Sequence, residues 1–288
     1  MERNSQFAKE NSIVLQGPIG VGKSTIAEEL AKRTKLPHVW ADTLRECPKD
    51  CEQIEQKIKD FEREIERLEK DSSSQSIKDT IVMYKHMLWL QKNYLSQRQL
   101  LPDLPNYADF GFSPEISSCL KDCYGPIAWH MYHKQFENLL LQELTEQVDF
   151  PCIIDLGGGM ASSPKAAYDK TVKEILASDN HYFSEWRMDS IFNFKKMDFS
   201  IIENSLKPFK NVVTFKQKVR NANGRGEGAE KLNKAFLSSG DFDKTATMSV
   251  DATGLFGNDL SLNNKKVDEI VSNILLARSE NVAVEMAR

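Results

Sequence analysis

The apolar residues of this chain alternate between short runs and longer stretches with helical spacing. The short runs are rich in β-branched side chains, which is typical of buried strands, and they cover residues 12–16, 37–42, 152–155, 211–215 and 247–252. Between them, apolar residues three or four positions apart predict helices, among them residues 127–148, 164–177 and 267–277. Strands that alternate with helices indicate an α/β fold, in which ligands gather at the carboxyl ends of the strands.

Residues 50–101 carry a different pattern, with apolar residues at alternating spacings of four and three, as in a coiled coil. These residues are Ile54, Ile58, Phe61, Ile65 and Leu68, followed by Ile77, Ile81, Tyr84, Leu88 and Leu95. Turn-forming residues 71–76 separate the two sets, which predicts an antiparallel helical hairpin. The hairpin is interpreted as a packing device, a cap over a substrate site or a dimerisation arm. Residues 102–125, which contain three prolines and two glycines, are predicted to form a structured loop.

The first predicted strand is followed by the phosphate-binding loop pattern G-x-x-x-x-G-K-[ST]. Its glycines let the backbone wrap a triphosphate with N–H groups pointing inward. Lys23 is placed to contact the β and γ phosphates, and the Ser24 hydroxyl to ligate Mg²⁺, at the N-terminus of a helix whose dipole favours anions. We therefore expect ATP and Mg²⁺ as cofactors. The expected nucleotide-binding residues are Gly17, Gly20, Gly22, Lys23, Ser24 and Thr25.

Two further predicted strands end in aspartate. Asp155 follows an apolar run and precedes Gly157, Gly158 and Gly159, an arrangement that suits a Mg²⁺ ligand opposite a phosphate loop. The glycines would bring backbone close to a bound substrate. Asp42 ends the second strand and is expected beside the phosphate loop; the alternative is a surface aspartate that caps residues 43–46.

Cations in the second half of the chain suggest weaker hypotheses. The glycine-rich residues 224–228 carry Arg225, and a mobile loop there would deliver Arg225 or Arg220 to the γ phosphate; a disordered connection is the equal alternative. Residues 181–196 mix aromatic and basic side chains, which favours a helix packed on the core with its charges in water over a site for an anionic ligand.

Composition narrows the class of protein. The chain has 288 residues, 40% of them hydrophobic, and a net charge of −4, which does not indicate nucleic-acid binding. The N-terminus lacks a signal-peptide core and no apolar stretch is long enough to cross a membrane, so we expect a cytoplasmic protein. The pairs Cys47/Cys51 and Cys119/Cys123 have three intervening residues rather than the two of zinc knuckles, which favours reduced thiols over a metal site or disulfides.

Taken together, the phosphate loop, Asp42, the glycine triplet and residues 250–254 resemble shikimate kinase, within the nucleoside-monophosphate-kinase-like P-loop kinases. The resemblance covers residues 10–46, 126–165 and roughly 210–278. It implies a three-layer α/β/α fold with a parallel five-stranded sheet, built from residues 1–46 and 126–288, with residues 47–125 inserted. It also implies that Asp42 holds the acceptor hydroxyl and takes its proton, and that the glycine triplet touches the acceptor.

The chain departs from this family at several positions. Trp40 stands where the family usually has an aspartate, and His133-Lys134 stands where it has an acceptor-binding arginine. Lysine lacks the bidentate fork with which arginine clasps a carboxylate. The family's late arginine has no match in residues 236–240, and an arginine-rich lid is absent from the sequence.

The sequence therefore predicts an ATP-dependent phosphotransferase for a small hydroxylated acceptor, with Lys23, Asp42 and Arg225 as catalytic residues. The expected acceptor-binding residues are Asp42, Lys134, Gly157, Gly158 and Gly159, and the expected metal ligands are Ser24 and Asp155. One alternative is a kinase of another small molecule, such as a nucleotide or a sugar acid. Another is a non-catalytic ATP-binding protein that engages a partner, or a second copy of itself, through the helical hairpin.

Overall fold

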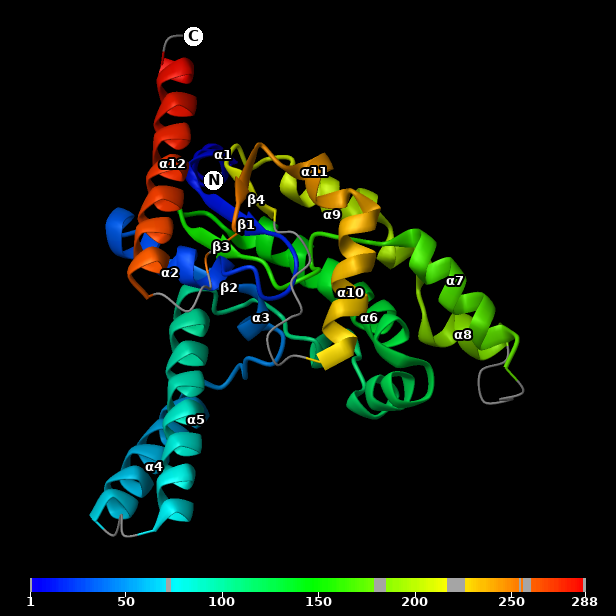
Figure 1. Cartoon of the computed structure of the whole chain (residues 1–288), viewed down its shortest axis with the longest axis horizontal. Coiled ribbons are helices and arrows are strands. Elements are labelled where there is room, and N and C mark those ends of the chain that lie inside the picture. Colours follow the sequence, from blue (N-terminus) through cyan, green and yellow to red (C-terminus); the bar gives the residue numbers. More distant parts are fainter. Residues whose placement is uncertain are drawn as a thin grey trace.

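A computed structural model describes residues 2–70, 74–178, 185–216, 226–253, 255 and 260–286. Its centre is a parallel sheet with the strand order β2-β3-β1-β4-β5 (Figure 1). The strands are β1 (Ile13–Gln16), β2 (His38–Trp40), β3 (Ile153–Asp155), β4 (Val212–Lys216) and β5 (Met248–Asp251). Each lies within or next to an apolar run of the sequence, so the strand predictions are confirmed to within two residues at each end.

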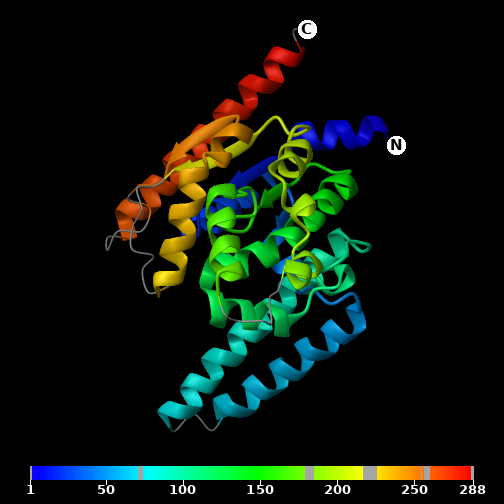
Figure 2. The same cartoon turned by 90° about the vertical axis from the view of Figure 1, so that its right-hand side faces the viewer.

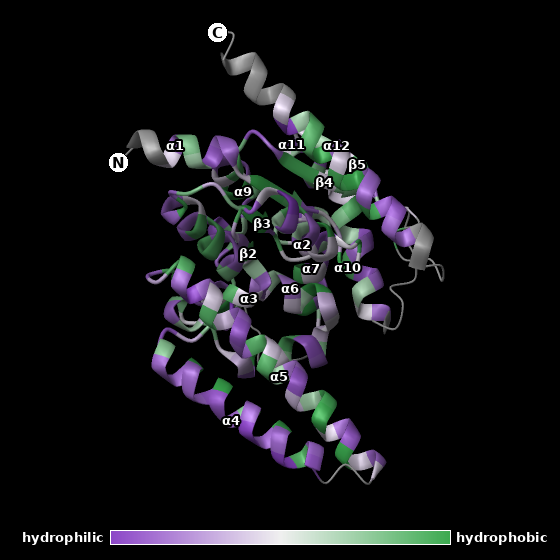
Figure 3. Cartoon of the chain, turned by 90° about the vertical axis from the view of Figure 1, so that its left-hand side faces the viewer, coloured by the Kyte–Doolittle hydropathy of each residue, from purple (hydrophilic) through white to green (hydrophobic). Residues whose placement is uncertain are grey.

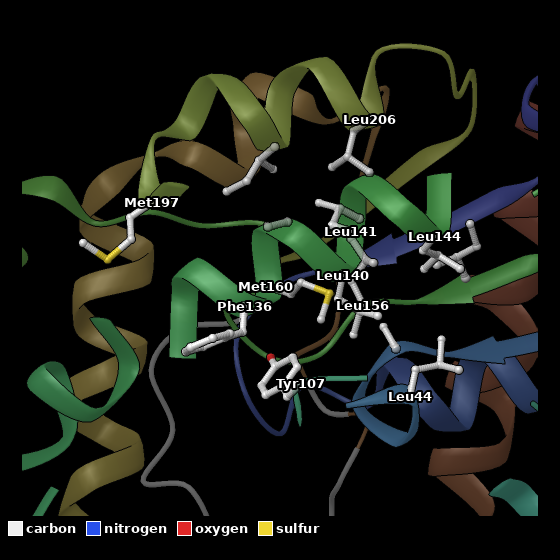
Figure 4. Packing of buried hydrophobic residues seen from close by; sticks show 14 of the residues in the cluster. Leu44, Tyr107, Phe136, Leu140, Leu141, Leu144, Leu156, Met160, Met197 and Leu206 are labelled. Carbon is white, nitrogen blue, oxygen red and sulfur yellow. The ribbon is translucent and has the colours of Figure 1, made fainter. Parts of the chain in front are cut away.

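Helices cover both faces of the sheet. Helix α2 (Lys23–Thr34) and helix α12 (Leu260–Met286) pack on one face, where Ile26 and Ile270 join the inward side chains of β1. Helix α6 (Pro114–Gln147) packs on the other face with α7 (Lys165–Leu176) and α9 (Phe199–Leu206) beside it. The close-up in Figure 4 shows leucines of α6 between the sheet and α9. This arrangement is an α/β fold consistent with the P-loop kinase architecture.

Apart from α4 and α5, the other described helices extend or connect these layers. They are α1 (Glu2–Asn11), α3 (Ala41–Leu44), α8 (Glu185–Ile191), α10 (Gly226–Ser239) and α11 (Asp241–Thr245), with 3₁₀ turns at Ala108–Phe110 and Phe194–Met197. Helix α10 begins inside the glycine-rich residues 224–228, where a mobile loop or a disordered connection is predicted, so both predictions are wrong from residue 226 onward. Helix propensity is a weak prior, and packing of α10 against α6 overrides it.

Helices α4 (Cys51–Lys70) and α5 (Gln75–Leu100) lie against each other and extend away from the sheet (Figures 1 and 2). The expected seam residues are all buried or half-buried, and α4 is hydrophilic along most of its length (Figure 3). We call these two helices the α4–α5 pair. That they form an insertion into a kinase core, residues 47–125, stays a prediction.

Part of the predicted loop 102–125 is helical, so the loop prediction is wrong from residue 114 onward. Helix α6 begins at Pro114, a residue that suits the first helical position because the missing N–H has no partner there anyway. The Ser113 side chain caps the helix by accepting a hydrogen bond from the Ile116 N–H at 3.2 Å. At Gly125 the backbone leaves the helical region (φ 82°, ψ −170°), so α6 is two helices joined at a kink.

Candidate functional site

The phosphate loop connects β1 to α2, as the sequence predicts. Gly17, Gly20 and Gly22 have φ angles of 144°, 79° and 90°, values that favour glycine. Helix α2 starts at Lys23 without a side-chain cap, which leaves its first-turn N–H groups to an anion. The buried Lys23 ammonium donates hydrogen bonds to the carbonyls of Gly17 (3.2 Å) and Pro18 (3.1 Å), so it is held at the mouth of the loop.

Ser24 and Asp155, the two expected metal ligands, are brought together across the sheet. Ser24 Oγ donates to Asp155 Oδ2 at 2.6 Å, although the residues are 131 positions apart. Asp155 is only 4% exposed, and the same Oδ2 accepts a hydrogen bond from the indole Nε1 of Trp40 at 2.8 Å. A hydroxyl and a carboxylate are hard oxygen ligands of the kind that Mg²⁺ prefers, so these two residues fit the ion. Thr25, next in the first turn of α2, is exposed.

Asp42 and the glycine triplet lie next to the phosphate loop. A side chain on Gly157 would collide with the Asp42 carboxylate, and one on Gly158 would come within 2.5 Å of Ile19 Cγ1 in the loop. Asp42 is in the first turn of α3, half-exposed, and forms an ion pair with Arg45. Gly157 and Gly158 therefore link Asp42 to the phosphate loop.

Lys134 lies behind the triplet rather than on that surface. Its side chain is fully buried, and its Nζ donates to the carbonyls of Gly159 (3.3 Å) and Met160 and contacts Glu137 Oε2 at 3.4 Å. Glu137 is buried as well, and its other oxygen lies 3.9 Å from the Arg45 guanidinium. A line of alternating charges thus runs from Asp42 through Arg45 and Glu137 to Lys134, which holds the backbone of the triplet.

Burial controls the protonation of this cluster. It lowers the pKa of Lys134 to about 8, against the attraction of Glu137. It would raise the pKa of Glu137, but Lys134, His130 and Arg45 together bring that pKa below its ordinary value. Burial also lowers the pKa of His130 to about 3, so His130 is neutral at pH 7. Its Nδ1 is 2.8 Å from the Tyr168 hydroxyl, while its buried Nε2 has no hydrogen-bond partner among the described residues.

Three residues that support the site were missed by the sequence analysis. Asn233 of α10 clamps the phosphate loop, because its side-chain amide accepts from the Ile19 N–H at 2.8 Å and donates to the Ile19 carbonyl at 3.1 Å. Arg45 and Glu137 belong to the charged line described above. Nothing in their local sequence distinguishes them from surface residues, since their partners come from other elements.

A pocket of about 350 Å³ opens at the carboxyl ends of β4 and β5. Lys216, Phe236, Asp251 and Thr253 are among the residues that line it. It adjoins the phosphate loop, since β4 packs beneath the loop where a side chain on Gly17 would meet the Phe215 carbonyl at 2.9 Å.

Other expectations are placed as follows. Arg220 and Arg225 lie outside the described residues. All five cysteines are free thiols, and the Sγ atoms of Cys119 and Cys123 are 3.9 Å apart on successive turns of α6. Within the described ranges, the helices are too short or too polar to span a bilayer.

Comparisons with known proteins add little to this geometry. No protein-family model matches the chain, and no curated protein is significantly similar to it. Among solved structures, a shikimate kinase from Acinetobacter baumannii in complex with shikimate aligns with a TM-score of 0.39 and 15% identity, over 95% of this chain and 98% of that chain. A similarity of this size carries no argument about activity. Any functional proposal for the chain therefore rests on its own parallel sheet, its loop motif and the Ser24–Asp155 contact.

Proposed function

We propose that this protein is an ATP-dependent phosphotransferase that acts on a small hydroxylated acceptor, as shikimate kinase does. The observation that carries the proposal is the 2.6 Å hydrogen bond between Ser24 and Asp155, directly after a phosphate loop with the backbone angles such a loop requires. A serine at the start of α2 and a carboxylate at the end of β3 are the pair that Mg²⁺–ATP needs.

In the proposed reaction the chain positions the reactants and neutralises charge. The loop N–H groups and Lys23 hold the β and γ phosphates, and Ser24 and Asp155 hold Mg²⁺, which supplies charge neutralisation on the transferring group. Asp42 orients the acceptor hydroxyl and accepts its proton. Its half-exposed carboxylate against Gly157 suits that role, because an acceptor can reach it from solvent while the phosphate loop is beside it.

Lys134 is assigned a different role from the one predicted. Because its ammonium is fully buried and directed at backbone carbonyls, we propose that it shapes the glycine triplet instead of contacting the acceptor. Arg45 lies on the acceptor side, since its partly exposed guanidinium pairs with Asp42. We propose that Arg45 meets an anionic group of the acceptor, as its fork geometry allows.

The test is ADP release from Mg²⁺–ATP, screened over small hydroxylated acids, sugar acids and nucleosides. Lys23→Ala is expected to abolish nucleotide binding or turnover, whereas Lys32→Ala, an exposed lysine in the last turn of the same helix, serves as the matched control. Unchanged ATP affinity in Lys23→Ala would contradict the loop assignment.

Asp42→Asn separates the two sides of the site. It is expected to slow transfer by about 10²–10⁴-fold with little change in ATP affinity, since a general base contributes a factor of that size. Asp79→Asn, at an exposed position of α5, is the control. ATP binding without acceptor-dependent ADP release from any compound would favour the non-catalytic alternative, in which the α4–α5 pair engages a partner.

A further inference from the structure

The carboxylate of Asp155, an expected Mg²⁺ ligand, accepts hydrogen bonds from two side chains. Residues Trp40 and Asp155 are direct neighbours in the β2–β3 register, so both side chains emerge at the same level and on the same face of the sheet. Ser24 Oγ and Trp40 Nε1 then converge on one oxygen of the carboxylate, at 2.6 and 2.8 Å. An indole N–H is a donor only, so Trp40 cannot itself ligate a cation.

Trp40 is in turn held by helix α5. The Gln97 side chain accepts from the backbone N–H of Trp40 at 2.9 Å and donates to the carbonyl of His38 at 2.8 Å, which fixes the edge strand on both sides of residue 39. Gln97 is 4% exposed, so these hydrogen bonds are protected from water. The indole of Trp89, two turns earlier on α5, contacts the Trp40 indole edge-on with ring centroids 5.2 Å apart.

We propose that Trp40 is a positioning residue of the metal site and that Gln97 of α5 fixes it there, so that α5 takes part in nucleotide binding. Its physical basis is that a donor to a ligating carboxylate sets the rotamer of that carboxylate and the direction of its free lone pairs. With Trp40 in place, Asp155 is directed at Ser24 before the nucleotide arrives. This inference rests on the proposed function only in requiring that the loop binds a Mg²⁺–nucleotide.

The test measures the affinity of ADP by isothermal titration calorimetry, once with Mg²⁺ and once with EDTA. Trp40→Phe keeps an aromatic ring but lacks the N–H. It is expected to weaken Mg²⁺–ADP binding about tenfold, the lower end of the effect of losing such an outer partner, and to leave ADP binding in EDTA unchanged. A merely structural role would lower both affinities together. Trp129→Phe makes the same kind of substitution on α6, where the indole lies against the His133 ring with centroids 4.3 Å apart. It is the matched control and is expected to match wild type.

Gln97→Met tests the link to α5. It is expected to weaken Mg²⁺–ADP binding in the same direction as Trp40→Phe, because β2 loses both amide hydrogen bonds while Trp40 keeps its indole. Circular dichroism shows whether each variant is folded. Trp40→His keeps a ring N–H, so it is expected to bind Mg²⁺–ADP more tightly than Trp40→Phe does, and it replaces Trp40→Phe in the comparison if that variant does not fold.

The outcomes are distinguishable. Equal Mg²⁺ dependence in wild type and Trp40→Phe overturns the positioning role but leaves the proposed function standing. Wild-type affinity in Gln97→Met overturns the part played by α5. A wild-type chain that binds ADP equally with Mg²⁺ and EDTA overturns both the Mg²⁺ site of the proposed function and this inference.

Discussion

Replacing Lys134 by methionine is expected to lower the free energy of unfolding by about 3 kcal/mol, at the lower end of the range for breaking a buried ion pair. Methionine has a similar length but leaves the Glu137 carboxylate buried without its 3.4 Å partner. It also removes the donor to the carbonyls of Gly159 and Met160. Arg45 remains 3.9 Å from Glu137 and compensates part of the charge, which is why the lower end of the range applies.

The double variant Lys134→Met/Glu137→Leu isolates the cause. Removing both charges together also removes the desolvation cost of each, so the double variant is expected to be more stable than Lys134→Met alone. Urea unfolding followed by circular dichroism measures both, with the exposed Lys121→Met on the same helix as control, expected within about 0.5 kcal/mol of wild type. The reasoning is refuted if the double variant is no more stable than Lys134→Met alone, or if Lys134→Met costs less than about 1 kcal/mol.

The same lysine predicts a pH dependence. Its pKa of about 8 in the native state lies below the ordinary value of 10.5, so between these values the unfolded chain binds a proton that the native state has released. Stability therefore rises with pH across this window. Between pH 8 and 9.5 the unfolding free energy of wild type is expected to rise relative to that of Lys134→Met. A constant difference would show that Lys134 keeps an ordinary pKa.

Three substitutions test local geometry. Gly159→Ala places a methyl group against the Phe236 ring at a φ of +95°, and is expected to cost about 1–3 kcal/mol in urea unfolding. Gly157→Ala places a methyl group against the Asp42 carboxylate, which is half-exposed and able to turn aside. Phosphoryl transfer to the acceptor is expected to slow while the thermal unfolding temperature changes little. The opposite result would show that Gly157 has a structural role only. Ser113→Ala removes the cap of α6 and is expected to cost about 1 kcal/mol, with unchanged ADP affinity as the check that the cap is remote from the loop.

The phosphate loop was predictable because its chemistry is local. Its glycines, Lys23 and Ser24 lie within a few positions of one another, between a strand and a helix whose own periodicities are clear. The strands followed equally well from short β-branched runs. The first part of α6 was not predicted, because prolines and glycines are typical of loops. In the structure, Pro114 begins the helix and Gly125 only kinks it.

The acceptor side depended on contacts that local pattern does not contain. Lys134 stood out in the sequence as a substitute for an arginine, yet its burial and its carbonyl partners are consequences of how α6 packs against the glycine triplet. In the sequence, Trp40 was notable only because it stands where the resembled family usually has an aspartate. Its hydrogen bond to Asp155 follows from the register of β2 and β3 and from Gln97 of α5.

The sequence by itself determined the fold class and the loop between β1 and α2, because periodicity and loop chemistry act over a few residues. The tertiary structure alone decided which distant groups share one environment: Trp40 with Asp155, and Lys134 with Glu137 and the triplet. The physical reason is that charge pairing and hydrogen bonding in a buried site depend on distance and desolvation, and both are set by the packing of whole elements.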